Sequence, residues 1–202
     1  MKTMKMICAA LLTSTAAMGV SAYEQGDVLL RVGATHVAPD DGATPDDVWA
    51  KGNTQLGLNV VYMATNNIGV ELLAATPFEH DIHLKGTGKV GTTKHLPPTL
   101  SVQYYFNNQS IVTPYLGLGV NYTTFFDENL EALGIENIEL KDSFGIAVQA
   151  GMDIALGGNW GLNVDVRKMS IDTEVDKKGA NVDGLKGDID PIVYSITALY
   201  KF

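Results

Sequence analysis

The last residues of the chain, Ile192-Val-Tyr-Ser-Ile-Thr-Ala-Leu-Tyr-Lys-Phe202, decide the fold. Every second residue from Ile192 to Phe202 is apolar or aromatic, and the residues between them are mixed in character. Successive side chains of a β-strand point to opposite faces, so this pattern gives one strand an apolar face and a mixed face. The segment is therefore predicted to be a strand that ends on an aromatic residue.

The same alternation occurs in seven segments upstream of this one. They are Val28–Gly33, Gln55–Tyr62, Ile68–Ala75, Leu100–Phe106, Leu116–Thr124, Ser143–Leu156 and Trp160–Arg167. The mixed face is rich in Gly, Ser and Asn, and it carries a few charges: Arg31, Glu71, Asp153, Asp165 and Arg167. Eight such segments predict an all-β fold, an eight-stranded antiparallel up-and-down transmembrane β-barrel.

The connections between the segments support the barrel, because short and long ones alternate strictly. Three are short, near Thr65–Asn67, Asn107–Val112 and Leu156–Asn159, and four are long, about His36–Asn53, Glu79–Lys94, Asp127–Lys141 and Asp172–Asp190. Outer-membrane barrels have an even number of strands, short periplasmic turns and longer external loops. Residues 23–202 are therefore predicted to form an outer-membrane barrel with three periplasmic turns and four external loops.

The alternative is a soluble lipocalin-like barrel, which also has eight antiparallel strands. A lipocalin would bury the apolar face and expose the charged one. Here the few balanced charges of the mixed face suit pairing inside a small lumen better than they suit a soluble surface. Aromatic residues near the strand ends also favour a membrane, where rings prefer the headgroup boundary; they are Tyr62, Tyr104, Phe106, Tyr122, Phe126, Trp160, Tyr194, Tyr200 and Phe202.

The N-terminal segment reads as a secretory signal. Lys2 and Lys5 precede an apolar or small run from Met6 to Val20, and small residues up to Ala22 suit a cleavage site. Residues 1–22 are therefore predicted to be a cleaved signal peptide, since the run is shorter than the roughly 20 residues of a spanning helix. The only cysteine, Cys8, lies in this segment, which leaves no thiol chemistry for the remainder.

Several long runs resemble the outer membrane protein W (OmpW) family. They are Asn53–Leu58, Tyr62–Phe78, His95–Leu100, Pro114–Phe126 and Tyr200–Phe202. The resemblance implies an eight-stranded barrel that passes small, mainly hydrophobic molecules across the outer membrane. It also implies that an inward-pointing Leu73 narrows a hydrophobic channel. Arg167 and Lys168 stand where aromatic residues are expected from relatives, so the resemblance implies no aromatic gate there.

A barrel of eight strands has an interior that side chains just fill. We expect Arg31, Glu71, Asp165 and Arg167 to form a polar plug in its lower half. Leu73, Ala75, Val61 and Met63 are expected to line a more apolar upper half, which makes them the predicted path of a hydrophobic solute. Such a solute would enter from outside, meet the plug and leave sideways.

Three prolines suggest where a sideways exit would lie. Pro77 ends one predicted strand, and Pro97 and Pro98 begin the next. Proline cannot donate to the hydrogen-bonded ladder, so the wall between these strands is expected to be weak near the outer rim. The alternative is that the prolines only bend strands as they leave the membrane.

The remaining chemistry is sparse. No catalytic constellation is found, so an enzyme is not predicted, and no cofactor is implied. The four histidines, His36, His80, His83 and His95, fall in or beside long connections and do not make a metal site of three or four converging ligands.

The net charge of −9, which becomes −11 without Lys2 and Lys5, argues against nucleic-acid binding. The expected partners are outer-membrane lipid, lipopolysaccharide and hydrophobic solutes. The alternative function is a closed, non-transporting barrel that presents acidic loops, of which the most acidic contains Asp127, Glu128, Glu131, Glu136, Glu139 and Asp142.

Overall fold

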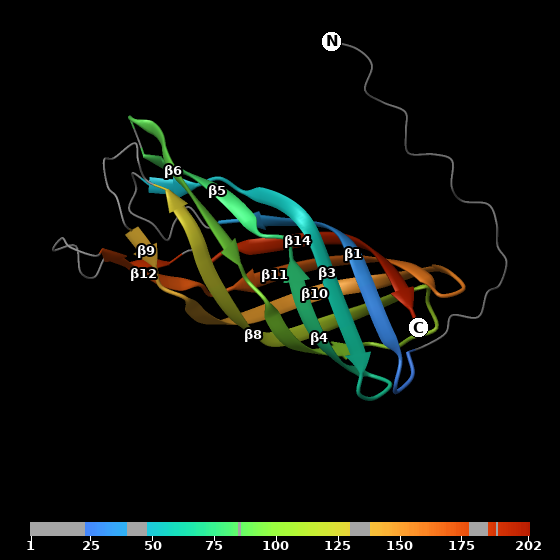
Figure 1. Ribbon diagram of the computed structural model, residues 1–202. Coiled ribbons are helices and arrows are strands. Elements are labelled where there is room, and N and C mark those ends of the chain that lie inside the picture. Colours follow the sequence, from blue (N-terminus) through green and yellow to red (C-terminus); the bar gives the residue numbers. More distant parts are fainter. Residues whose placement is uncertain (1–22, 40–47, 85, 130–137, 178–185, 189) are drawn as a thin grey trace, which may run out of the picture.

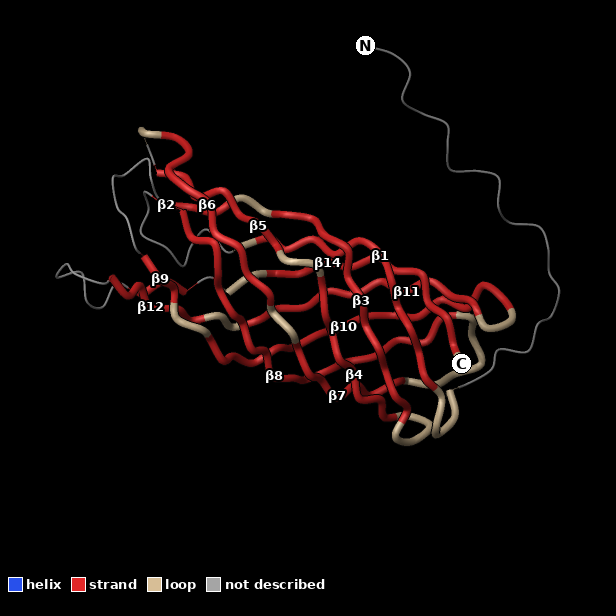
Figure 2. Tube along the Cα trace, viewed as in Figure 1, coloured by secondary structure: helices blue, strands red, loops and turns tan. Residues whose placement is uncertain are grey.

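The wall of the protein is a closed, elongated β-barrel (Figures 1 and 2). The computed structural model describes residues 23–39, 48–84, 86–129, 138–177, 186–188 and 190–202. Eight strands form the wall: β1 (Val28–Ala38), β3 (Asn53–Met63), β4 (Ile68–Ala75), β7 (Thr99–Tyr105), β8 (Val112–Asn129), β10 (Ser143–Gly157), β11 (Trp160–Met169) and β14 (Ile192–Lys201). Each is antiparallel to its neighbours in the order β10-β11-β14-β1-β3-β4-β7-β8, and pairing of β8 with β10 closes the ring. The predicted fold is confirmed.

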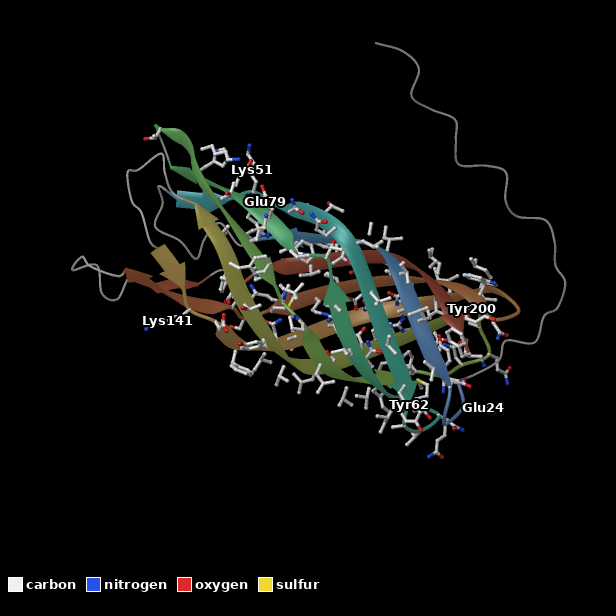
Figure 3. All side chains as sticks on the ribbon, viewed as in Figure 1. Glu24, Lys51, Tyr62, Glu79, Lys141 and Tyr200 are labelled. Carbon is white, nitrogen blue, oxygen red and sulfur yellow. The ribbon has the colours of Figure 1, made fainter. Side chains whose placement is uncertain are left out.

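Three short connections gather at one end of the barrel, between β3 and β4, between β7 and β8, and between β10 and β11. The C-terminus lies at the same end (Figure 1), and so do the labelled side chains of Glu24, Tyr62 and Tyr200 (Figure 3). We call this the short-turn end and the opposite one the long-loop end. The predicted signal peptide, residues 1–22, lies outside the described residues.

The long-loop end carries more strand than the sequence predicts. β5 (Phe78–Leu84) and β6 (Gly88–Leu96) form a hairpin where a loop was expected, and β2 (Val48–Ala50) pairs with β5. β8 is longer than β7, so its last part pairs with β6 instead, from Leu96 opposite Thr124 onward. β6 forms a strand because it pairs with this extended end of β8, and the local sequence of the hairpin does not reveal that partner. β9 (Ile138–Leu140), β12 (Asp172–Lys177) and β13 (Lys186–Asp188) form a separate small sheet.

The outward face of the wall is apolar. Phe144, Ile146 and Leu118 are 77%, 62% and 61% exposed. Further exposed apolar side chains cover every wall strand, among them Val32, Leu56, Leu58, Ile68, Leu72, Leu100, Val102, Leu116, Val120, Val148, Met152, Val166 and Ile196. Soluble monomers rarely expose a continuous apolar patch above a few hundred Å². The apolar face therefore points outward, as predicted, and the lipocalin-like alternative is wrong.

Aromatic rings border this apolar surface near the short-turn end. Tyr104 contacts Phe106 with ring centroids 5.2 Å apart, and Tyr200 contacts both Trp160 and Phe202 at 4.8 Å. Nearer the long-loop end, the rings of Tyr122 and Phe144 lie 4.7 Å apart. Rings at two levels are the arrangement expected of the aromatic girdles that flank the apolar band of a membrane barrel.

A charge placed in the middle of this surface is expected to be costly. Leu118 on β8 lies between Val102 and Val148 of the neighbouring strands. Leu118→Arg should lower the free energy of unfolding by about 2–4 kcal/mol, the cost of an arginine at the midplane of a membrane barrel. Urea unfolding in lipid vesicles, followed by tryptophan fluorescence, measures this change. Glu79→Arg on the hairpin is the matched control, and equal effects of the two substitutions would contradict an apolar surround at Leu118.

Candidate functional site

The interior of the barrel contains a layer of five ionisable side chains, which we call the charged layer. It consists of Arg31 from β1, Glu71 from β4, Asp153 from β10, and Asp165 and Arg167 from β11. Their strands come from different sides of the wall, and all five side chains are buried, with Arg31 and Glu71 fully so. The structure thus brings together the four residues expected to form a plug and adds Asp153.

Glu71 joins the two arginines of the charged layer. Its Oε2 lies 2.6 Å from Arg167 Nη2, and its Oε1 lies 3.5 Å from Arg31 Nη1. Arg31 Nη2 also lies 2.7 Å from Asp153 Oδ2, and Arg167 Nη2 lies 3.7 Å from Asp165 Oδ1. Each buried charge therefore has an opposite charge close by, which buried ions require.

Neutral groups complete the network around these ions. Tyr23 donates to Asp153 Oδ2 at 2.7 Å, and Tyr115 donates to Asp165 Oδ2 at 3.0 Å. Asn59 donates to Glu71 Oε1 at 2.8 Å, and Arg31 donates to the Tyr105 hydroxyl at 2.8 Å. The hydrogen bonds tie the charged layer to three further wall strands, β3, β7 and β8, and to the segment before β1.

Two glycines make space for this network. A Cβ on Gly117 would collide with the Gln149 amide, and one on Gly151 would collide with the Tyr115 ring. Gln149 itself hydrogen-bonds Glu71 and Arg167. Glycines therefore line the wall where the largest polar side chains lie across the lumen.

An apolar cluster, here called the short-turn cluster, lies next to the charged layer on its short-turn side. It consists of Tyr23, Leu29, Val61, Met63, Tyr105 and Tyr115. Val61 and Met63 were expected in the upper half of the lumen, and the structure places them here instead. β3 runs toward a short turn and β4 runs away from it, so Met63 is level with Gly69 and Val61 with Glu71.

A second apolar cluster, the long-loop cluster, lies on the other side of the charged layer. It contains Val37, Phe78, Phe125, Ala147, Met169, Ile171 and Val193, with Ala75 packed against it. Leu73 is buried, pairs with Asn59 and Thr99, and lies one inward position nearer the charged layer than Ala75. Leu73 and Ala75 thus lie on the long-loop side, as expected. Ala147 and Val193 of the cluster lie in predicted strands, whereas Val37, Phe78, Phe125, Met169 and Ile171 lie beyond the ends of the predicted strands and were therefore missed.

The wall is interrupted beside the long-loop cluster. β4 and β7 pair as far as Leu73 opposite Thr99, and β5 and β6 begin with Phe78 opposite His95. Among the described residues, no strand pairing joins residues 74–77 to residues 96–98. We call this interruption the proline break.

The prolines at the break do not all face it. Thr76 N–H donates to the Leu56 carbonyl of β3, and Tyr122 N–H of β8 donates to the Pro98 carbonyl. The N–H and C=O of one strand residue point to the same neighbour. The backbone nitrogens of Pro77 and Pro97 therefore face the break, where they supply no donor, whereas Pro98 faces β8.

The four histidines lie outside the charged layer. His36 is in β1, His80 and His83 are in β5, and His95 is in β6. Within the described ranges, no group of three or more His, Cys, Asp or Glu side chains is arranged to hold a metal ion.

The part of the chain that the structure describes contains no helix long and apolar enough to cross a membrane. The side chains of the acidic loop from Asp127 to Glu139 lie outside what the structure describes.

Comparison with known proteins identifies the family. The family model described as "OmpW family" matches residues 24–202. The chain belongs to the OmpW family. It is 42% identical to outer membrane protein W of Escherichia coli strain K12, over 98% of this chain and 99% of the relative.

Solved structures agree with this membership. The crystal structure of the outer membrane protein OprG from Pseudomonas aeruginosa superposes with a TM-score of 0.76 at 41% identity and covers 90% of this chain and 98% of that one. The solid-state NMR structure of outer membrane protein AlkL in lipid bilayers superposes with a TM-score of 0.70 at 26% identity and covers 98% and 97%. This OmpW-family barrel is therefore a protein of the bacterial outer membrane, whose apolar face contacts lipid.

Proposed function

We propose that this barrel passes small hydrophobic molecules into the outer membrane and that it has no enzymatic activity. A solute enters at the long-loop end, which faces outward because outer-membrane barrels place their short turns in the periplasm. It passes Ala75 and Leu73 within the long-loop cluster. The charged layer then stops it, and it leaves through the proline break into the bilayer.

The observation that carries this proposal is the position of the proline break relative to the charged layer. An apolar solute would have to separate paired buried ions to continue along the axis, at a cost of several kcal/mol for each ion left unpaired. At the break, no strand pairing in the described part of the chain joins residues 74–77 to residues 96–98, directly beside apolar interior side chains. The sideways route therefore requires fewer interactions to be broken.

One observation favours the alternative of a non-transporting barrel that presents loops. Phe78, Met169 and Val193 of the long-loop cluster are each about 1% exposed, so the outer end of the interior is closed by packing. Passage consequently requires this cluster to open, whereas a structural barrel would keep it shut. The two functions differ in whether the barrel raises solute uptake above that of cells without the protein.

Restoring donors at the break tests the proposal. Pro77→Thr with Pro97→Thr should slow uptake of a medium-chain alkane by up to about 30-fold, because two new ladder hydrogen bonds of about 1 kcal/mol each would have to break when the wall opens. The assay measures initial uptake rates in Gram-negative cells that lack their own relatives of the protein.

Pro98→Thr is the matched control, since its restored N–H faces β8 and should leave uptake unchanged. Equal uptake rates for the wild type, the control and the double variant would show that the solute does not leave through the proline break. Rates no higher than in cells without the protein would favour the structural barrel.

A further inference from the structure

Four aromatic rings contact one another on the long-loop side of the proline break. We call them the ring row: Phe78 and His80 of β5, His95 of β6 and Phe125 of β8. The imidazoles of His80 and His95 stack with centroids 4.9 Å apart and planes 7° from parallel. Phe78 stacks on His95 at 5.6 Å, and Phe125 lies 5.9 Å from His95. The row thus joins the β5–β6 hairpin to β8 through ring contacts.

The two imidazoles are packed as neutral groups. His80 and His95 are 3% and 4% exposed, and Nε2 of each is buried without a hydrogen-bond partner. His80 Nδ1 donates to the Lys51 carbonyl at 2.6 Å, which leaves its Nε2 as the site for a second proton. A proton there would be buried with no acceptor, beside another imidazole.

The charged surroundings do little to favour protonation. His36 of β1 and Asp81 of β5 act on His80, and His80 acts on His95. Asp81 points to the other face of the hairpin and pairs with Lys89 at 2.6 Å. Burial lowers the pKa of His80, and it lowers the pKa of His95 to about 3, with His80 as the second cause.

The ring row is placed where a movement of the hairpin would open the proposed route. Phe78 follows Pro77 directly, and His95 lies two residues before Pro97, so both flank the proline break. Phe78 and Phe125 also belong to the long-loop cluster that closes the interior. Displacement of the hairpin from β8 would therefore separate the ring row, uncover the cluster and widen the break together.

We propose that the ring row is a proton-controlled latch: protonation of His80 and His95 at acidic pH drives the β5–β6 hairpin away from the barrel and opens the interior. This inference rests on the proposed function for its purpose, but the hairpin movement itself requires no solute. Two stacked imidazolium rings repel one another, and each needs water to accept its hydrogen bonds. Outward movement of the hairpin separates the two rings and exposes them to water.

The direction of the pH effect follows from the two states of His95. Its pKa is about 3 when packed and returns to about 6.5 when solvated, so the open state binds the extra proton more readily. The contribution of His95 to the closed state is therefore fully present above pH 6.5 and is lost as the pH falls from there toward 3. Between pH 7.5 and pH 5, His95 alone raises the ratio of open to closed molecules by about 30-fold.

Spin labels can detect this movement without any solute. Lys89→Cys on the hairpin and Ile196→Cys on β14 provide the labels, in a chain whose Cys8 is replaced by Ser and which is reconstituted in lipid nanodiscs. In the chain that keeps both histidines, we expect a population with a longer distance between the two labels to appear as the pH falls from 7.5 to 5. His80→Phe with His95→Phe keeps four rings but accepts no proton, and should stay closed at both values.

His36→Gln is the matched control, since it removes a nearby imidazole outside the ring row and should leave the movement in place. An unchanged distance in the wild type, or the same change in the doubly substituted chain, would overturn the latch. Neither result bears on uptake at neutral pH. Conversely, a pH-dependent distance without any alkane uptake would keep the latch and reject the proposed passage.

Discussion

Replacement of Glu71 by leucine is expected to lower the free energy of unfolding by about 3–5 kcal/mol, the range for breaking a buried ion pair by removing one partner. Glu71 is the only carboxylate of the charged layer that contacts both arginines, at 2.6 Å from Arg167 and 3.5 Å from Arg31. Without it, two fully buried guanidinium groups share Asp153 and Asp165 alone. Asn59 and Gln149 lose their acceptor as well.

The measurement is equilibrium unfolding by urea in lipid vesicles, compared between variants. Asp81→Asn is the matched control, since it breaks the Lys89 pair on the exposed face of the hairpin and should cost less than about 1 kcal/mol. If Glu71→Leu lowered the free energy of unfolding no more than this control does, the charged layer would be hydrated. It could then not block the passage of a solute along the barrel axis.

A charge at Leu73 is expected to abolish uptake. Leu73→Arg places a guanidinium between the charged layer and the long-loop cluster, where Asn59 and Thr99 are its neighbours across the wall. A solute that passes this point would contact a charge in place of an apolar side chain. Desolvation of such a group costs well over the roughly 1.4 kcal/mol that corresponds to tenfold, so initial alkane uptake should fall by at least about tenfold.

Leu73→Met is the control for this prediction, because it preserves volume and apolar character and should keep uptake within about twofold. Circular dichroism and urea unfolding establish that the arginine variant still forms the barrel. Undiminished uptake in a folded Leu73→Arg protein would take Leu73 off the route.

The wall of the barrel could be predicted from the sequence because alternation is a local signal. One apolar face against lipid requires every second residue to be apolar, so segments such as Leu116–Thr124 identify themselves without knowledge of their partners. The same alternation predicts that Arg31, Glu71, Asp165 and Arg167 point into the interior, and the structure brings them together with Asp153.

Height along the axis could not be predicted in the same way. Val61 and Met63 point inward like Leu73, but β3 and β4 run in opposite directions. Their register places Val61 level with Glu71 of the charged layer and Met63 nearer the short-turn end. The hairpin of β5 and β6 was missed for a related reason. Its pairing depends on β8, a strand more than fifteen residues away in sequence, and its outward face is charged because it projects beyond the apolar surface.

Photolabelling with an alkane that carries a diazirine tests the sideways route most directly. In lipid vesicles, bilayer background falls on outward side chains such as Leu118, so inward side chains report only the interior. The account predicts labels on Leu73, Ala147 and Met169, in or next to the long-loop cluster, and none on Leu29, Val61 or Met63 of the short-turn cluster. Equal labelling of both sets would mean that the solute crosses the charged layer along the axis, and would contradict the account.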